Sequence, residues 1–195
     1  MVKVLAVNNY PTRERFERLE KCFVENGARV TSIDWDAANA TLFDTFDGVV
    51  LSGSPDMMSE PKIWNKFRDE IDAIKRSSSP ILGVCFGHQM MAHTFGARVV
   101  QDGRNVLEMV NTKVLERDPI FAGLPSSMML LESRHEVVES LPKQFRLLAE
   151  SEASRIAAMK HETRPLYGVQ FHPERYTREN PDGRAVVGNF IRMLG

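Results

Sequence analysis

The sequence contains little of what several large protein classes require. Only two of its 195 residues are cysteines, Cys22 and Cys85, which argues against a disulfide framework and for reduced thiols. No apolar run approaches the roughly 18 residues of a membrane span, and the first residues lack the apolar core of a signal peptide. Lys and Arg number 25 and Asp and Glu 26, so no excess of positive charge attracts nucleic acid. We therefore expect a cytoplasmic protein with no nucleic-acid and no membrane partner.

Motifs for bound cofactors are also missing. Neither G-x-x-x-x-G-K-[ST] nor G-x-G-x-x-G occurs, so the sequence predicts no phosphate-binding loop for ATP or a dinucleotide. Cys85, His88 and His93 do not have the spacing of a common zinc site, and a helix would turn the two histidines to different faces. We expect no cofactor and no metal.

Apolar runs alternate with amphipathic stretches, a pattern typical of an α/β sheet. Strands are expected over 2–7, 28–33, 48–51 and 80–84, with helices over 12–26, 63–76 and 88–95. After Gly96, short β segments follow one another, and the run 128–131 is expected to lie in the core. A helix over 185–194 closes the chain. The pattern predicts a single domain over 1–195, with an open, mostly parallel sheet, helices on both faces and a smaller antiparallel β extension.

The segment from Pro80 to Gln89 carries the first candidate for chemistry. A buried strand runs into a tight turn in which Gly83 and Gly87 flank Cys85, and a helix follows at once. This is the pattern of a nucleophile elbow, where glycines allow close approach of neighbouring backbone. A helix N-terminus lowers the pKa of a thiol and favours the reactive thiolate. The alternative is a small buried hydrophobe, which is how we interpret Cys22 beside Phe23 on an apolar helix face.

The segment from Leu166 to Glu174 supplies a partner for that thiol. An apolar strand ends in His172, followed by Pro173 and Glu174. Sites in open α/β sheets form outside the carboxyl ends of the strands, so Cys85 and His172 are expected to meet there. His172 would take the thiol proton, and Glu174 would orient the imidazole and stabilise its cation.

A third segment, Val49 to Pro55, is a strand that leads into a loop of small residues. Such a loop can direct a backbone N–H at a developing oxyanion, and the N–H of Phe86 could be the second donor.

Together these segments resemble the class I glutamine amidotransferase family, also called the triad glutaminases. The family's nucleophile motif is similar to Gly83-x-Cys85-x-Gly87-x-Gln89, and its His-Pro-Glu motif is similar to Gly168-Val-Gln-Phe-His172-Pro173-Glu174. Its oxyanion-loop motif is similar to Leu51-Ser-Gly-Ser-Pro55. The order and separations agree over nearly the whole chain. The resemblance implies the flavodoxin-like fold of that family.

The resemblance also implies a role for each matching residue. Cys85 would be the nucleophile, His172 the base and acid, and Glu174 the orienting carboxylate. The other implied site residues are Ser54 and Phe86 for the oxyanion-hole N–H groups, and Gly53, Gln89, Ser133 and Arg134 for binding substrate.

The implied reaction is hydrolysis of L-glutamine through a γ-glutamyl thioester on Cys85, with ammonia passed to a separate synthetase. Within the family, the chain is most similar to the stand-alone glutaminase subunit of two-subunit GMP synthases, on Cys85-Phe-Gly-His-Gln89 and Ile156-Ala-Ala-Met-Lys-His161. The implied partner is an ammonia-using subunit of the ATP-pyrophosphatase type.

Other functions stay open. Ser133-Arg134-His135-Glu136 stands where the GMP synthase branch usually has Ser-His-x-Asp, and Asn8-Asn9-Tyr10-Pro11 is closer to the anthranilate synthase type. The alternatives are the glutaminase component of anthranilate or aminodeoxychorismate synthase, a γ-glutamyl peptidase or hydrolase acting alone, and a non-catalytic regulatory relative.

Overall fold

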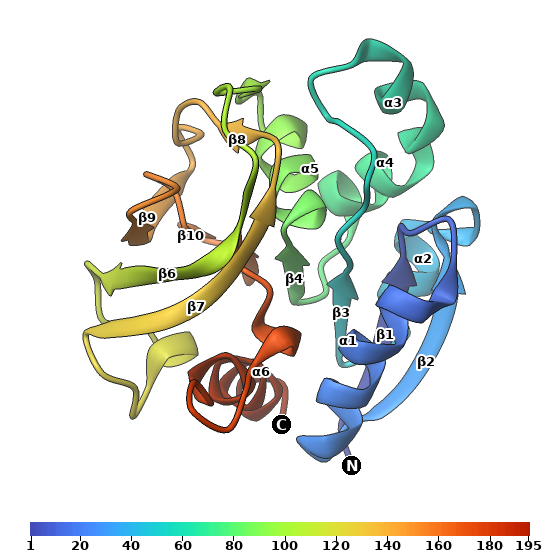
Figure 1. Ribbon diagram of the computed structural model, residues 1–195. Coiled ribbons are helices and arrows are strands. Elements are labelled where there is room, and N and C mark those ends of the chain that lie inside the picture. Colours follow the sequence, from blue (N-terminus) through green and yellow to red (C-terminus); the bar gives the residue numbers. More distant parts are fainter.

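A nine-stranded mixed sheet runs through the molecule (Figure 1). The computed structural model describes all 195 residues. The strand order is β2-β1-β3-β4-β11-β10-β9-β6-β7, and β5 and β8 form a separate two-stranded sheet. The strands are β1 (Lys3–Asn8), β2 (Arg29–Asp34), β3 (Gly48–Leu51), β4 (Ile81–Val84), β5 (Val99–Val100), β6 (Val106–Val114), β7 (Ser127–Arg134), β8 (Val137–Val138), β9 (Phe145–Ser151), β10 (Ala158–His161) and β11 (Leu166–Val169).

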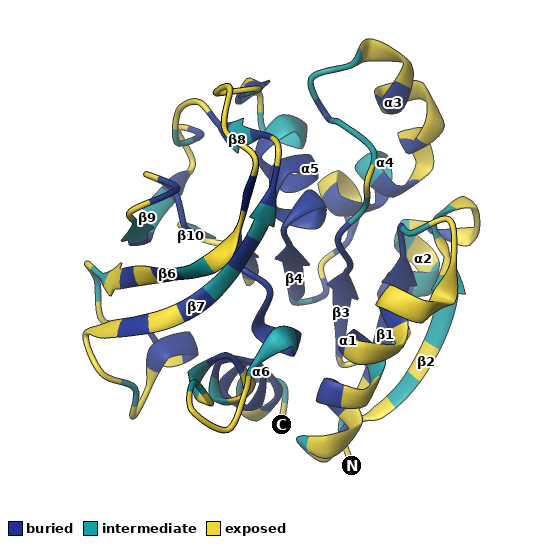
Figure 2. Ribbon diagram, in the orientation of Figure 1, coloured by how far each residue is buried: buried dark blue, intermediate teal, exposed yellow.

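The parallel half of the sheet consists of β2, β1, β3, β4 and β11. Every residue of β3, β4 and β11 is buried, and Figure 2 shows β3 and β4 in the dark blue of buried residues. Strands covered on both faces are continuously apolar rather than alternating, which is why these short runs could be identified in the sequence.

The remaining strands, β10, β9, β6 and β7, pair antiparallel and extend the same sheet beyond β11. The expected antiparallel extension is therefore continuous with the parallel half. Side chains of β7 alternate between faces, so Met128 and Leu130 are buried whereas Met129 is 41% exposed. The prediction that the whole run 128–131 lies in the core was thus wrong for Met129.

Helices cover both faces of the parallel half, as predicted. One face is covered by α1 (Arg13–Glu25) and α6 (Asp182–Met193), which share a core with Val4, Val50 and Val84. The other face is covered by four helices, which pack on Leu5, Val49 and Ile81. These helices are α2 (Ala40–Phe43), α3 (Pro61–Lys66), α4 (Arg68–Arg76) and α5 (Phe86–Thr94). The chain also forms three 3₁₀ turns, which are η1 (Trp35–Ala37), η2 (Pro119–Phe121) and η3 (Pro173–Arg175).

The single helix expected over 63–76 is two helices that meet at Phe67. Phe67 leaves the helical conformation, with φ of −99° and ψ of 21°, and is buried. Its ring packs 5.1 Å from the ring of Trp35 and 4.9 Å from that of Phe86. The apolar periodicity continues across this break, because both helices turn the same face to the sheet.

Two glycines allow β3, β4 and α5 to touch through their backbones. A Cβ on Gly83 would lie 2.5 Å from the carbonyl oxygen of Gly87, and a Cβ on Gly87 would lie 2.7 Å from that of Leu51. Real Cβ atoms do not approach backbone so closely, so neither position accepts a side chain without movement. The start of α5, and with it Cys85, is therefore seated directly on the sheet.

We predict that Gly83→Ala lowers the free energy of unfolding by about 1–3 kcal/mol, because the methyl group forces α5 away from β4. Urea denaturation measures the loss, and the rate of Cys85 alkylation reports the displacement of the thiol. Gly27→Ala is the comparison, since Gly27 has a positive φ of 88° but no atom near its missing Cβ. That variant should lose stability without changing Cys85. Wild-type stability and alkylation in Gly83→Ala would contradict the close-contact interpretation.

Candidate active site

The predicted catalytic residues meet at the carboxyl ends of the parallel strands. Cys85 follows β4, and His172 lies shortly after its neighbour β11. Both line one cavity of about 450 Å³, together with Glu174, Ser54 and Ser133. The other residues that line it are Tyr10, Glu14, Arg15, Arg18, Pro55, Leu107, His135 and Arg175.

Cys85 occupies a strained turn between β4 and α5. Its φ is 51°, and it is the only residue other than glycine with a positive φ. The turn is held on both sides, because the Cys85 N–H donates to the Val169 carbonyl at 2.8 Å and the Gln89 N–H donates to the Cys85 carbonyl at 3.0 Å. The sulfur thereby lies at the N-terminus of α5, where the helix dipole is positive.

His172 is oriented from two directions. Its Nδ1 lies 2.7 Å from Oε1 of Glu174, and its backbone N–H donates to the Leu131 carbonyl on β7 at 2.7 Å. Burial alone would lower the pKa of His172, but the negative charges of Glu174 and Cys85 raise it well above its ordinary value. The contact with Glu174 therefore favours the cationic form of His172.

Two glutamine side chains connect α5 to the sulfur. Gln89 donates from Nε2 to the Glu136 carbonyl at 2.9 Å and to Oε1 of Gln170 at 3.2 Å. Gln170 in turn donates from Nε2 to the Cys85 sulfur at 3.6 Å. Gln89 is buried behind the cavity, and its amide hydrogens point to these two partners. Sequence reasoning missed Gln170, although it lies inside the Gly168–Glu174 motif and near the end of β11.

Ser133 and Arg134 lie on opposite faces of β7. Ser133 lines the cavity, and its carbonyl accepts a hydrogen bond from the Cys85 thiol at 3.4 Å. Arg134 does not line the cavity, and its side chain has no exposed area. The guanidinium pairs with Glu132 at 3.3 Å and with Asp102 at 3.0 Å. It fixes the strand that presents Ser133.

The loop after β3 passes close to the imidazole. Gly53 faces the hydroxyl of Tyr10, and a Cβ on Gly53 would lie 3.1 Å from Cε1 of His172, so a side chain at this position would have to displace Tyr10. Burial, followed by the charges of Cys85 and Glu174, raises the pKa of Tyr10, which keeps its hydroxyl neutral as a hydrogen-bond donor. Tyr10 was also missed, although it follows β1 at the same edge of the sheet.

Ser54 and Phe86 present backbone N–H groups from two elements. Ser54 lines the cavity, and its hydroxyl accepts a hydrogen bond from the Asp56 N–H at 3.1 Å. Phe86 buries its ring, but it is the first residue of α5. The N–H groups of a first helical turn have no acceptor within the helix, so that of Phe86 is available for another acceptor.

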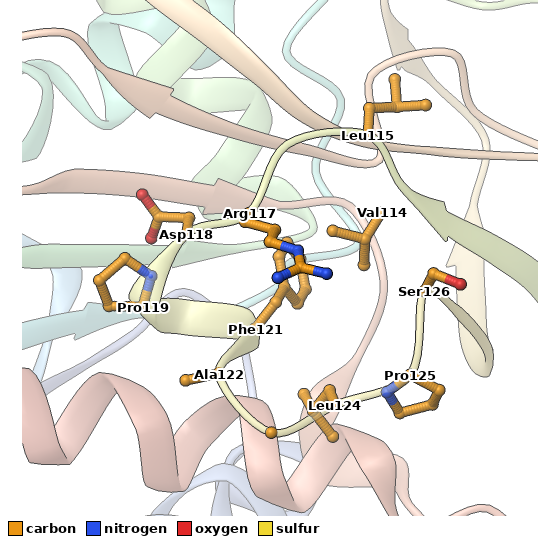
Figure 3. Close-up of a pocket in the computed structure, with 11 residues that line it drawn as sticks. Val114, Leu115, Arg117, Asp118, Pro119, Phe121, Ala122, Leu124, Pro125 and Ser126 are labelled. Carbon is orange, nitrogen blue, oxygen red and sulfur yellow. The ribbon is translucent and has the colours of Figure 1, made fainter.

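A larger hollow than this cavity lies elsewhere on the molecule. It has a volume of about 740 Å³ and is bounded by the connection between β6 and β7, including Arg117, Phe121 and Leu124 (Figure 3). It contains no cysteine, no histidine and none of the predicted site residues.

No helix of the structure has both the length and the apolar character needed to cross a membrane.

The two cysteines differ in environment. Cys22 is buried on α1, and burial, followed by the charges of Glu174 and Glu25, raises the pKa of its thiol to about 12. Cys22 therefore stays protonated in the core, as the sequence predicted, whereas Cys85 lines the cavity.

We predict that iodoacetamide at pH 7.5 modifies Cys85 and leaves Cys22 intact in the folded protein. A thiol pKa of about 12 leaves less than roughly 10⁻⁴ of Cys22 as thiolate, the reactive form. Peptide mass spectrometry after timed quenching measures both sites, and labelling in urea shows that both peptides are detectable. Equal rates for the two cysteines in the folded protein would contradict this.

We also predict that Glu174→Gln lowers the pKa of His172, because the neutral amide removes a charge that favours the imidazolium. An NMR titration of the imidazole carbons measures the shift. Glu14→Gln is the matched control, since Glu14 also lines the cavity but is exposed and forms no hydrogen bond with His172. An unchanged pKa in Glu174→Gln would remove Glu174 from its assigned contact.

Comparison with known proteins agrees with this geometry. The family model for glutamine amidotransferase class-I matches residues 12–193. The glutamine-hydrolysing GMP synthase subunit from Pyrococcus abyssi is 39% identical over 151 residues, 76% of each chain. The corresponding subunit from Methanothrix thermoacetophila is 33% identical over 198 residues, 98% of each chain.

Solved structures agree as well. A structure described as that of a GMP synthase subunit from Thermoplasma acidophilum has a TM-score of 0.87 at 30% identity and covers 100% of this chain and 94% of its own. A glutamine amidotransferase from Thermotoga maritima shares the fold, with a TM-score of 0.76 at 21% identity over 90% of this chain and 77% of its own. This chain belongs to the class I glutamine amidotransferase family.

Proposed function

We propose that this chain is the glutaminase subunit of a two-subunit GMP synthase. It hydrolyses L-glutamine to glutamate and ammonia, and a separate synthetase subunit of the ATP-pyrophosphatase type uses the ammonia. The observation that carries the proposal is the meeting of Cys85, His172 and Glu174 in one cavity of a chain from this family. The relatives from Pyrococcus abyssi and Methanothrix thermoacetophila support the acceptor, since both are named as glutamine-hydrolysing subunits of GMP synthase.

In the first half-reaction, His172 takes the thiol proton of Cys85, and the sulfur attacks the amide carbon of the glutamine side chain. The carbonyl oxygen becomes an oxyanion, which the N–H groups of Ser54 and Phe86 stabilise. The C–N bond then breaks, His172 returns the proton to the leaving nitrogen, and ammonia departs. Glu174 holds Nδ1 of His172 throughout and stabilises the imidazolium.

In the second half-reaction, a water molecule attacks the γ-glutamyl thioester. His172 accepts a proton from that water, the oxyanion forms again, and the C–S bond breaks. His172 returns its proton to the Cys85 sulfur, which restores the thiol, and glutamate is released. The same imidazole serves both half-reactions, so it must accept a proton and then return it in each of them.

The other family positions divide into two groups. We assign substrate contact to Ser133 and to the backbone of Gly53, and their positions beside Cys85 and His172, respectively, support this assignment. Gln89 and Arg134 act from behind the cavity: Gln89 holds Gln170 against the sulfur, and Arg134 fixes the strand that carries Ser133.

The proposal predicts that Cys85→Ala abolishes glutamine-dependent GMP formation by the complex with its ATP-pyrophosphatase subunit. The same variant should keep GMP formation from added ammonium chloride, because only the ammonia source is lost. Both rates are measured by the absorbance change on conversion of XMP to GMP. Cys22→Ala is the matched control and should keep both activities, since Cys22 is buried away from the cavity.

Two outcomes would contradict the proposal. Full glutamine-dependent activity in Cys85→Ala would remove the assigned nucleophile. Turnover of γ-glutamyl peptides but not of free glutamine, with the synthetase present, would identify a hydrolase that acts alone.

A further inference from the structure

Glu70 is a buried carboxyl group on a helix that carries none of the catalytic residues. It is the third residue of α4, on the face that packs toward the sheet, and its side chain has no exposed area. Phe67 and Ile74, one helical turn to either side, are buried on the same face. Burying a carboxyl group without full hydrogen bonding is costly, so its presence among apolar residues requires a reason.

The carboxyl group contacts one neighbour, Asn9. The side-chain Nδ2 of Asn9 donates to Oε1 of Glu70 at 3.1 Å and to the Ser52 carbonyl at 3.3 Å. The Asn9 backbone N–H donates to Oγ of Ser52 at 2.8 Å, and that hydroxyl donates to the Gly53 carbonyl at 2.9 Å. Asn9 therefore binds both the backbone carbonyl and the hydroxyl of Ser52. Ser52 lies immediately before the loop that carries Ser54.

We propose that Glu70 is a positioning residue for the oxyanion loop: its buried carboxyl group holds Asn9, and Asn9 holds Ser52 and thereby the N–H of Ser54. The inference rests on the proposed function for the catalytic meaning of that loop. The hydrogen-bond chain itself runs through Glu70, Asn9, Ser52 and Gly53 regardless of the substrate.

The environment of Glu70 favours the neutral acid. Burial raises its pKa from 4.5 to about 8, and the hydrogen bond from Asn9 offsets only part of this effect. No cation lies close enough to contribute. The titratable groups on the elements packed against α4 are Asp36 on η1, Asp44 after α2, Lys62 and Lys66 on α3, and His88 and His93 on α5; those on α4 itself are Arg68, Asp69, Asp72, Lys75 and Arg76.

Ionisation of Glu70 would disturb the chain of contacts. Oε2 of Glu70 and Oδ1 of Asn9 are both buried without a hydrogen-bond partner, so a carboxylate at Glu70 would leave one charged oxygen unsolvated. The Asn9 amide alone cannot solvate that charge, so we expect water to enter beside the carboxylate and to compete with Asn9 for it. We therefore expect the loop to loosen as pH rises through about 8.

The test compares Glu70→Gln, which imitates the neutral acid, with the wild type. The first readout is peptide-level hydrogen exchange over 7–9 and 52–54 between pH 6 and 9.5, corrected for intrinsic rates. In the wild type, protection of Asn9 and Ser52 should fall above pH 8, and in Glu70→Gln it should stay constant. The same fall in both proteins would overturn the proposal, whether or not either protein releases ammonia from glutamine.

The second readout is glutamine turnover by the complex. Glu70→Gln should keep kcat within about twofold at pH 7 and lose the wild-type decline above pH 8 that originates at Glu70. Glu70→Ala should lower kcat about tenfold with little change in KM, less than the loss of a whole oxyanion donor. A wild-type alkaline decline in Glu70→Gln would overturn the proposal even if Glu70→Ala does not fold.

Glu132→Gln is the matched control, since Glu132 is equally buried but bonds Ser151, Ser154 and Arg134 in the antiparallel half of the sheet. It should keep the pH dependence of exchange at 52–54. Activity absent from every variant, with the exchange difference intact, would refute the proposed function and leave the positioning role standing.

Thermal stability should follow the same protonation. The pKa of Glu70 is raised on folding, so the unfolded chain ionises near pH 4.5 whereas the folded protein ionises only near pH 8. The contribution of this group to stability is therefore full below pH 4.5, declines between pH 4.5 and about 8, and is constant above. The difference in melting temperature, Glu70→Gln minus wild type, should therefore increase from pH 4.5 to about 8. Parallel curves would show that Glu70 is not protonated and would overturn the proposal.

Discussion

Cys85 adopts a backbone conformation that no other residue except glycine shares, with φ of 51° and ψ of −101°. Such a conformation costs about 1–3 kcal/mol and persists only where the surroundings enforce it. Here the enforcement comes from β11, which accepts the Cys85 N–H, and from α5, which is seated on β3 and β4 through Gly83 and Gly87. The sulfur consequently projects at the carboxyl ends of the parallel strands, where His172 also lies, shortly after β11. Every other element of the site is arranged around this one turn.

The antiparallel half of the sheet provides the opposite wall. Strand β7 reaches over the ends of β4 and β11, where its Leu131 carbonyl accepts from His172 and its Ser133 carbonyl accepts from Cys85. These contacts use the backbone, so they depend on register rather than on side-chain identity. Arg134 and Glu132 lock that register from the other face, buried and paired with each other. A buried pair of this kind adds little net stability, but it specifies one arrangement of the strand, and the site needs one arrangement.

The parallel strands and the meeting of Cys85 with His172 could be predicted because their signals are local. One apolar run is followed by a cysteine with glycines on both sides, and another is followed by a histidine and a proline. Each of these patterns identifies the end of a strand. What the sequence did not reveal depends on contacts between distant segments. Gln170 and Tyr10 are ordinary polar residues until folding places them beside Cys85 and Gly53. Arg134 was predicted to bind substrate from its place in a motif. Successive side chains of a strand point to opposite faces, so Arg134 points away from the cavity that the neighbouring Ser133 lines. Similarly, the break at Phe67 follows from ring packing against Trp35 and Phe86, which apolar periodicity cannot register.

Two glutamates near the site have opposite tasks, and their surroundings explain the difference. Glu174 lies against His172, where a negative charge is balanced by the imidazolium that forms during proton transfer. Glu70 lies behind the loop that we propose stabilises an oxyanion, with only the amide of Asn9 as a hydrogen-bond partner. A negative charge at Glu70 would repel the oxyanion through a poorly screened interior, whereas a neutral acid there supports the loop without opposing it. A carboxyl side chain therefore serves at both positions through different contacts, with the imidazole at Glu174 and with the amide of Asn9 at Glu70.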